Sequence, residues 1–206
     1  MHVIRTGVFS VNSLVVPCGN KQCFVVDPAA CSLSGDENKI LDYIKKEKME
    51  CVGIFLTHSH FDHIMGIAPL KKAFPSAKIA LHKLEEQELV SPPGPMNTSV
   101  INFFGSPELL AEVSKQPAAD VILSDGDDWF GWKVIHTPGH TPGSVCLYKE
   151  GTLISGDTLF DYGGYGRTDM YGGDEAQIMH SLAKLHSEIP AGTIVYPGHD
   201  SFGFSL

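Results

Sequence analysis

The stretch CVGIFLTHSHFDH, residues 51–63, joins a short apolar run to a cluster of histidines. Residues 51–57 are mostly apolar, which predicts a buried strand. The next six positions hold three histidines and one aspartate. Histidine is the commonest metal ligand among side chains, and a neighbouring carboxylate can bind the metal or orient an imidazole. We therefore expect a strand that ends in a metal site.

Three further ligand candidates follow predicted strands elsewhere in the chain. HTPGHTPGS contains His140, SGDTLF contains Asp157, and YPGHD contains His199. A glycine immediately precedes each of the three, and glycine permits tight turns and close backbone approach. Strand ends and the loops beyond them are where a rigid scaffold presents functional side chains. We expect these residues to lie beside the histidine cluster.

The spacing within the cluster predicts two metal sites. In extended backbone, residues two apart point to the same side, so His58 and His60 can bind one ion together. The chain would then turn and let Asp62 and His63 face a second ion. The two oxygens of Asp157 could bridge both ions, which one imidazole nitrogen cannot do. The predicted ligands are His58, His60 and His140 for the first ion, Asp62, His63 and His199 for the second, and Asp157 between them.

A site with two divalent cations is electronically suited to hydrolysis. The cations supply four positive charges, whereas Asp62, Asp157 and a bridging hydroxide supply three negative ones. The remaining positive charge would stabilise an oxyanion and hold the bridging water as hydroxide, because zinc-bound water has a pKa of about 7. We expect two divalent metal ions, zinc first, with iron or manganese as alternatives. Asp62 is also the predicted catalytic residue, because it could orient the hydroxide or relay a proton.

The remaining sequence predicts two sets of strands, each accompanied by helices. We expect strands over residues 2–11, 13–18, 22–27, 51–57 and 77–82, and later over 120–129, 132–137, 144–150, 151–157 and 192–200. Helical spacing or composition predicts helices over residues 36–49, 67–74, 83–90, 107–116 and 174–189. The segment 91–107 is rich in proline and glycine and predicts a long surface loop. Layer rules then favour an αββα sandwich, two sheets packed together with helices outside.

Length and composition predict one soluble globular domain over residues 1–206. Hydrophobic residues make up 43% and charged residues 19%, and no apolar run reaches the length of a membrane span. The N-terminus lacks the pattern of a secretory signal, so we expect a cytoplasmic protein. A net charge of −9 without a basic cluster argues against nucleic acid as a partner. The oligomeric state stays open.

The other histidines and the cysteines receive structural interpretations. Five cysteines without CxxC spacing predict reduced, buried thiols rather than disulfides or a zinc site. The histidines without partner spacing are His2, His82, His136, His180 and His186. Of these, His136 lies four residues before His140 and is expected at most to support its loop.

THSHFDH, HTPGHTPGS, SGDTLF and PGHD occur in this order, and together they resemble the metallo-β-lactamase superfamily from nearly end to end. The resemblance implies the αββα sandwich and a dinuclear site on the seven positions above. VVDPAA, residues 25–30, is similar to the end of the family's second strand, which implies that Asp27 supports the ligands from behind. Ala29 stands where the family often has glycine.

Within that superfamily, the chain most resembles short hydrolases of the glyoxalase II group. The segment SGDTLFDYGGYGRTDMYGGD, residues 155–174, carries this likeness. It implies hydrolysis of a small-molecule thioester such as an acyl-glutathione, with Arg167 holding a substrate carboxylate. Full-length glyoxalase II has a further helical domain that helps to hold glutathione, whereas this chain ends seven residues past His199. Specificity for glutathione is therefore left open.

Two alternative functions share the same residues. Persulfide dioxygenases also resemble this chain, with a single iron held by the counterparts of His58, His140 and Asp157. Two imidazoles and one carboxylate form a facial triad suited to iron(II) and oxygen chemistry. Hydrolysis of a lactone or another ester is the second alternative. A metal-binding module without catalysis is disfavoured, because no ligand position has been lost.

Overall fold

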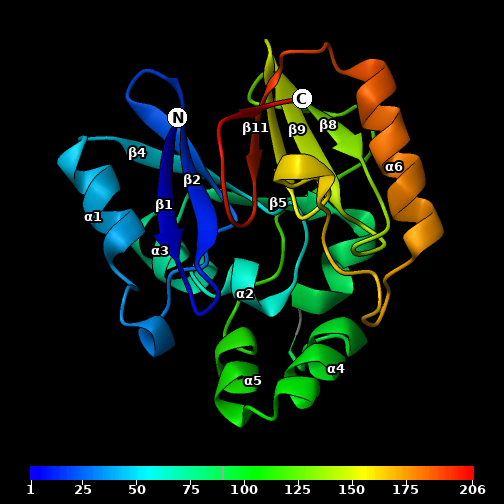
Figure 1. Ribbon diagram of the computed structural model, residues 1–206. Coiled ribbons are helices and arrows are strands. Elements are labelled where there is room, and N and C mark those ends of the chain that lie inside the picture. Colours follow the sequence, from blue (N-terminus) through cyan, green and yellow to red (C-terminus); the bar gives the residue numbers. More distant parts are fainter. Residues whose placement is uncertain (90) are drawn as a thin grey trace.

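Two six-stranded sheets pack face to face in the computed structural model, which describes residues 1–89 and 91–206 (Figure 1). The first sheet runs in the order β1 (His2–Thr6), β2 (Val11–Gly19), β3 (Gln22–Val26), β4 (Glu50–Phe55), β5 (Lys78–His82) and β6 (Val121–Leu123). The second runs in the order β12 (Phe204–Ser205), β11 (Ile194–Pro197), β10 (Thr152–Gly156), β9 (Val145–Lys149), β8 (Trp132–His136) and β7 (Asp128–Trp129).

Both sheets are mixed, and their parallel pairs bring important strand ends together. In the first sheet β1–β3 are antiparallel, whereas β3–β6 are parallel, with Val26 opposite Phe55. In the second sheet β10 and β11 are parallel, with Gly156 opposite Pro197. Parallel strands end at the same edge of a sheet. The segments that follow β3, β4, β10 and β11 therefore leave the sheets close to one another.

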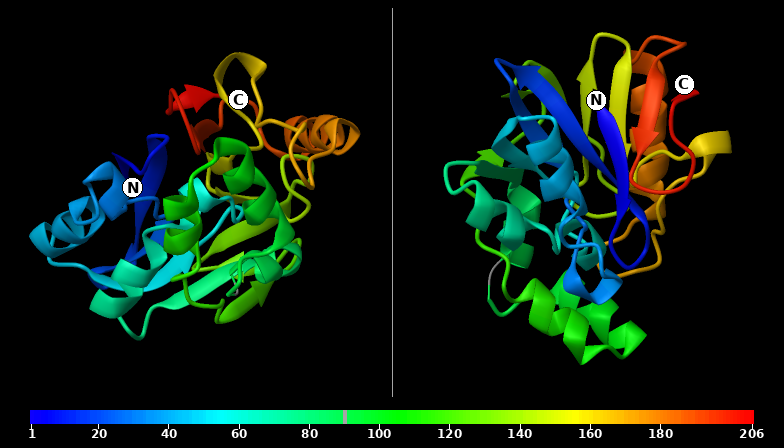
Figure 2. Two further views of the ribbon diagram at one scale, coloured as in Figure 1. Left: turned by 90° about the horizontal axis from the view of Figure 1, so that it is seen from below. Right: turned by 90° about the vertical axis from the view of Figure 1, so that its left-hand side faces the viewer.

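Helices cover the outer face of each sheet, which confirms the predicted αββα sandwich (Figures 1 and 2). The helices α1 (Lys39–Lys46) and α3 (Ile67–Ala73) lie over the first sheet, and α6 (Glu175–Glu188) lies over the second. Side chains alternate along each strand. Val15 therefore packs toward the helices, whereas Leu14 and Val16 pack between the sheets. Ile135 packs toward α6 and Val134 toward the first sheet.

The loop predicted over residues 91–107 is wrong, because the structure has the helix α4 (Pro95–Phe104) there. Proline occupies its first turn, where the missing N–H would have no intrahelical partner. Gly105 ends it with a φ of +63°, in the left-handed region that glycine tolerates. Proline and glycine thus mark the two ends of this helix. Met96 and Ile101 are buried and fix the helix to the body of the protein.

Several other boundaries differ from those predicted. The strand expected over 2–11 ends at Thr6, where Gly7 begins a turn. Residues 120–129 supply two strands instead of one, β6 in the first sheet and β7 in the second. The helix expected over 83–90 is the 3₁₀ segment η2 (Lys83–Leu89), and residue 90 lies outside the described residues. The short elements α2 (Phe61–Ile64), α5 (Pro107–Val113), η1 (Ser32–Ser34) and η3 (Asp161–Gly163) complete the fold.

The described residues bear on the expectations about membrane spans and cysteines. Among the described residues, no helix combines the length and apolar character that crossing a bilayer requires. All five cysteines are free in the described part of the chain. The single domain over residues 1–206 and the cytoplasmic location stay predictions.

Substitution of Phe24 tests the packing of the core between the two sheets. The Phe24 side chain is 0% exposed and packs against Trp129 and Trp132, with ring centroids 6.4 Å away in both cases. We expect Phe24→Ala to lower the free energy of unfolding by about 3–5 kcal/mol, because it removes a fully buried ring and leaves a cavity. Urea denaturation of the metal-free protein measures this change.

Phe130 supplies a matched control, since its ring stacks on Phe24 at 5.6 Å but is 40% exposed. Phe130→Ala should cost no more than about 1 kcal/mol. Equal losses for the two variants would contradict the assignment of Phe24 to the core.

Candidate metal centre

The seven predicted ligands come from four segments that follow strand ends in the two sheets. The first four ligands follow β4, and the next lies in the loop between β8 and β9. Asp157 directly follows β10, and His199 comes two residues after β11. The structure brings all seven together, although they span 142 positions of the chain. His60, Asp62, His140, Asp157 and His199 line the floor of one cleft, and His58 and His63 are buried beneath it. Their role as ligands stays a prediction, which the geometry below supports.

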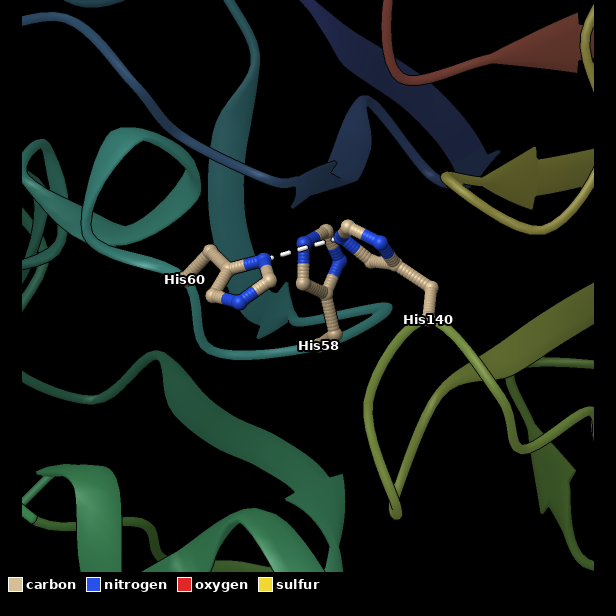
Figure 3. Close-up of side chains that lie close together, drawn as sticks. All are labelled: His58, His60 and His140. Carbon is tan, nitrogen blue, oxygen red and sulfur yellow. Dashed lines mark hydrogen bonds between the residues drawn. The ribbon is translucent and has the colours of Figure 1, made fainter. Parts of the chain in front are cut away.

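The first set consists of His58, His60 and His140, shown in Figure 3. Nδ1 of His60 lies 2.8 Å from Nε2 of His140. The His58 ring lies 4.9 Å from the His60 ring and 4.8 Å from the His140 ring, measured between centroids. All three imidazoles are buried. Three buried imidazoles in mutual contact are the ligand set of a divalent transition metal.

The second set consists of Asp62, His63 and His199. The Nε2 atoms of the two histidines lie 3.1 Å apart. Oδ2 of Asp62 lies 3.4 Å from Nε2 of His199 and 3.7 Å from Nε2 of His63. The set thus offers two nitrogens and one anionic oxygen to the same point.

Asp157 lies between the two sets. Its Oδ1 is 3.6 Å from Nε2 of His63, and its Oδ2 is 3.5 Å from Nε2 of both His140 and His199. One carboxylate therefore faces members of both sets, as a bridging ligand must.

Four of the five imidazoles are oriented by a hydrogen bond from Nδ1–H to the protein. Each of these bonds leaves the lone pair of Nε2 turned toward the centre, the arrangement expected of metal-binding histidines. The four pairs are His58 with Thr57 Oγ1 at 3.1 Å, His63 with Asp27 Oδ2 at 3.1 Å, His140 with the Arg167 carbonyl at 2.8 Å and His199 with the Phe9 carbonyl at 3.2 Å. His60 is the exception, because its Nδ1 faces the centre.

Asp27 supports the ligands, as its place in the sequence suggested. Its carboxylate accepts hydrogen bonds from the Thr57 amide at 2.8 Å and the Thr57 hydroxyl at 2.6 Å, besides that from His63. Asp27 also lies within 4.8 Å of the ligand atoms of His58 and His63. Because both of its oxygens are already hydrogen-bonded, we assign it an orienting role and not that of a ligand.

Two glycines create the space that the site needs. A Cβ at Gly198 would collide with the carboxylate of Asp157 and would lie 2.8 Å from the ring of His63. Gly156 has a φ of +50°, and a Cβ there would collide with Thr57. Larger residues at either position would push the ligands apart.

The residues present fit two divalent cations. Six side-chain atoms among the described residues are buried without a hydrogen-bond partner, and three of them belong to the site: His58 Nε2, His60 Nε2 and Asp157 Oδ1. Buried polar atoms normally have partners, because leaving one unpaired costs about 1–3 kcal/mol. For His58 and Asp157 a cation within the site would supply the missing interaction. Neutral imidazoles and carboxylates are also the donor types that zinc, iron and manganese accept.

The two sets differ in their affinity for protons. Burial, followed by repulsion from neighbouring imidazoles, lowers the pKa of His60 to about 3. Burial also lowers the pKa of His140 to about 4 and that of His58 well below its ordinary value. These three side chains are neutral at physiological pH and hence ready to bind a metal.

The second set holds protons when no cation is present. Burial lowers the pKa of His63, but the nearby carboxylates, first Asp157 and then Asp62, outweigh this effect and raise it to about 10. The pKa of His199 is raised because Asp62 and Asp157 outweigh its burial. Burial favours the neutral form of Asp62, yet His63 and His199 hold its pKa well below the ordinary value.

Glu85 is a functional residue that the sequence interpretation missed. It is buried, and its Oε2 accepts hydrogen bonds from the amide of Ser59 at 3.0 Å and its hydroxyl at 2.5 Å. Its Oε1 accepts from the Thr141 hydroxyl at 2.7 Å and the Gly143 amide at 2.8 Å. Ser59 separates the first two ligands of the first set, and Thr141 follows the third. One carboxylate therefore joins the two loops that carry this set.

The signal for this role is weak in the sequence. In KLEEQEL, residues 83–89, the acidic residues indicate a solvated helix face, yet Glu85 and Glu88 are both buried. Glu88 accepts hydrogen bonds from the amides of Met96 and Asn97 at 3.0 and 2.9 Å. It thereby holds the first turn of α4. The spacing of three residues along η2 is the feature that turns both carboxylates inward.

The cleft above the ligands has a volume of about 350 Å³ and mainly apolar walls. Its apolar lining residues are Phe9, Phe61, Val100, Phe104, Phe160, Tyr165 and Met170. Two of these belong to α4, so the helix that the sequence did not predict forms part of the wall. Ligands of both sets line the floor.

Arg167 lines the cleft, but its side chain is exposed and forms a bidentate ion pair with Asp169 at 2.9 and 2.8 Å. Its clearest link to the centre is its carbonyl, which orients His140. The predicted contact with a substrate carboxylate stays a prediction.

The remaining histidines lie outside the two sets in the described residues. Nε2 of His136 donates to the Pro142 carbonyl at 2.9 Å, and its ring stacks on that of His82 at 4.2 Å. His136 therefore supports the loop of His140, as expected.

Comparison with known proteins places these features in one family. The sequence model that describes the metallo-beta-lactamase superfamily matches residues 6–199 of this chain. The probable metallo-hydrolase YqgX of Bacillus subtilis (strain 168) is 35% identical, with 86% of this chain and 80% of the relative covered. A hydroxyacylglutathione hydrolase of Aeromonas salmonicida (strain A449) is 32% identical, with 96% of this chain and 65% of the relative covered. This chain thus spans about two thirds of the length of that enzyme.

Solved structures show the same fold. BLEG-1 B3 metallo-beta-lactamase superimposes with a TM-score of 0.85 at 32% identity, covering 99% of this chain and 93% of the other. TTHA1623 in a di-iron-bound form gives 0.78 at 28% identity, covering 98% and 93%. ETHE1 from Myxococcus xanthus gives 0.71 at 23% identity, covering 100% and 78%, a likeness of fold alone.

Exchange of Glu85 tests its link to the first set. We expect Glu85→Gln to weaken the binding of one of two cations by about 10- to 100-fold, because the amide nitrogen replaces an acceptor at two protein donors. Metal analysis after dialysis against a weak chelator measures the loss.

Glu88→Gln is the matched control, since it changes a buried carboxylate in the same turn. It should leave both cations bound, because its partners belong to α4. Equal metal loss in both variants would show that η2 affects metal binding only through the overall stability of the fold.

The pKa shifts predict that only one cation competes with protons. His63 holds a proton at about pH 7.5, so uptake by the second set should release about one to two protons, and its affinity should rise with pH toward about 10. The first set is already neutral, and its affinity should be nearly flat between about pH 6.5 and 8. Calorimetry in buffers with different ionisation enthalpies counts the protons.

Two variants assign the signals to the sets. His140→Gln should keep the pH-dependent uptake, and His199→Gln should lose it. Proton release that survives in His199→Gln and disappears in His140→Gln would reverse the assignment.

Proposed function

Because this chain belongs to the metallo-β-lactamase superfamily, we propose that it is a binuclear metal-dependent hydrolase that cleaves a small-molecule thioester. The observation that carries the proposal is the pair of complete ligand sets, each with two members at the floor of one cleft, and Asp157 facing both sets. The relatives named hydroxyacylglutathione hydrolase support a thioester as the substrate. We propose zinc as the cation, with iron or manganese next, since TTHA1623 has a di-iron-bound form.

The presence of a second set favours two cations over a single iron. A single iron on His58, His140 and Asp157 would leave Asp62, His63 and His199, which also form a complete set, without a cation. This observation supports hydrolysis rather than the oxygen chemistry of the persulfide dioxygenases.

The residues of the chain divide the work of hydrolysis among them. Two divalent cations, when bound, lower the pKa of a water molecule to about 7 and stabilise negative charge on the substrate's carbonyl oxygen. Asp62 lines the cleft and is ionised, so it can accept a hydrogen bond from the attacking water and orient it. Phe61, Phe104 and Phe160 exclude bulk water, which strengthens every charge interaction at the floor.

The guanidinium of Arg167 places a positive charge at the cleft, and this group already forms an ion pair with Asp169. A substrate carboxylate would have to displace Asp169, so we propose that it makes a secondary contribution to substrate binding. The net charge of −9 disfavours nucleic acid, and we propose a small molecule as the partner.

A direct assay tests the function. Purified protein loaded with two equivalents of zinc should hydrolyse a lactoyl thioester, lose activity with a chelator and regain it with zinc. Asp62→Asn, reconstituted to the same metal content, should lower kcat by about 10²- to 10³-fold with little change in KM.

Asp200→Asn is the control, because Asp200 is an exposed residue at the cleft. In the described part of the chain it is the carbonyl of Asp200, not its carboxylate, that accepts hydrogen bonds, from Arg5 and Asn12. The kcat of this variant should stay within about threefold of the parent. Absence of turnover at full metal loading would refute the proposal. If metal analysis found one iron per chain and the protein consumed oxygen with a persulfide, the site would be that of a dioxygenase instead.

A further inference from the structure

An apolar groove adjoins the cleft of the metal centre where α4 ends and α5 begins. Its volume is about 370 Å³, and its apolar lining consists of Val8, Phe9, Leu33, Phe104 and Leu109. Phe9 and Phe104 also line the cleft, so the two spaces share a wall. Glu108 is the one charged residue among the described residues that line the groove.

The groove exposes large apolar side chains together. Phe9 is 44%, Phe104 43% and Leu33 45% exposed. Contact between them and an apolar ligand would remove this surface from water, at about 25 cal/mol per Å². The aromatic wall is already packed, because Phe9 lies 5.4 Å from Phe104 and 5.7 Å from Phe61 between ring centroids. The groove therefore needs little ordering before it binds a ligand.

One wall of the groove is fixed to the metal centre. The carbonyl of Phe9 accepts the hydrogen bond from Nδ1 of His199, at 3.2 Å. The same residue thus orients a predicted metal ligand through its backbone and lines the groove with its ring. A ligand whose reacting carbonyl lies over the centre would reach the groove across the boundary that Phe9 and Phe104 form.

A second neighbouring pocket differs in chemistry. It has a volume of about 190 Å³ and is lined by Val100, Phe103, Tyr171 and the ion pair of Arg167 with Asp169. Val100 and Arg167 also line the central cleft. The cleft therefore shares residues with an apolar groove at Phe9 and Phe104 and with a charged pocket at Val100 and Arg167.

We propose that the groove binds the acyl chain of the thioester substrate, and that this chain is an extended apolar one. The inference rests on the proposed hydrolase function. The two arms of a thioester then occupy different pockets, with the apolar acyl arm against Phe9 and Phe104 and the more polar thiol arm toward Arg167. In the reaction, water adds to the carbonyl carbon, the carbon–sulfur bond breaks, and a carboxylic acid and a thiol leave.

A chain-length series tests the assignment. The zinc-loaded protein is assayed with straight-chain acyl esters of one small neutral thiol, N-acetylcysteamine, from acetyl to octanoyl. We expect kcat/KM to rise about twofold per added methylene, below the roughly fourfold of complete burial because the groove is open to solvent. A flat or falling series would overturn the proposal.

Adjacent phenylalanines provide matched variants. Phe104→Ala should flatten the dependence on chain length, whereas Phe103→Ala should retain it, because Phe103 is 72% exposed and lines the other pocket. Leu33→Asp should also flatten it by placing a charge in the groove, and its exposed position makes folding insensitive to the change. The slope is measured within each variant, so incomplete metal loading does not alter it.

The outcomes separate the inference from the function. If no ester is hydrolysed, the hydrolase proposal fails, and the same esters become unreacted ligands whose dissociation constants calorimetry can measure. Tighter binding with each methylene would still support the groove, and equal binding would overturn it. A third outcome is a flat series with a protein that is a dimer in solution and that Leu33→Asp converts to a monomer. This result would overturn the proposal and show that the groove binds a second copy of this chain.

Discussion

The arrangement depends on one requirement, that buried imidazoles present a lone pair to a common point. Four of the five imidazoles do so because Nδ1 gives its proton to a fixed acceptor, whereas His60 presents Nδ1 itself. Asp27 and Thr57 meet this requirement for two ligands of the first sheet. The Asp27 carboxylate accepts hydrogen bonds from the Thr57 hydroxyl and from Nδ1 of His63, and the Thr57 hydroxyl oxygen accepts one from Nδ1 of His58. This contact also joins the ends of β3 and β4, so the pairing of two strands and the orientation of two ligands are the same interaction.

A second interaction connects the centre to the surface that would hold a substrate. The 3₁₀ segment η2 turns Glu85 toward the ligand loops and Glu88 toward the start of α4. Asn97 of α4 in turn donates to the carbonyl of Ser59, at 2.7 Å. The wall of the cleft is thus tied to its floor by short polar contacts, which fixes the distance between a bound substrate and the ligand sets.

The sequence predicted those features that local spacing determines. Alternation and apolar runs located most strands, and glycines at strand ends pointed to His140, Asp157 and His199 as neighbours of the histidine cluster. It did not predict α4, because proline and glycine have the same appearance at helix ends as in loops. Nor did it identify Glu85, since the burial of an acidic side chain depends on donors more than fifty positions away, at Thr141 and Gly143.

The two sheets contribute unequally to the proposed ligand sets. The N-terminal sheet supplies four of the seven residues within six positions, while His140, Asp157 and His199 come from the C-terminal sheet. Each set therefore contains residues from both halves of the chain, and neither set is complete until the two sheets have packed together. Formation of the site and closure of the sandwich are in this sense a single folding event.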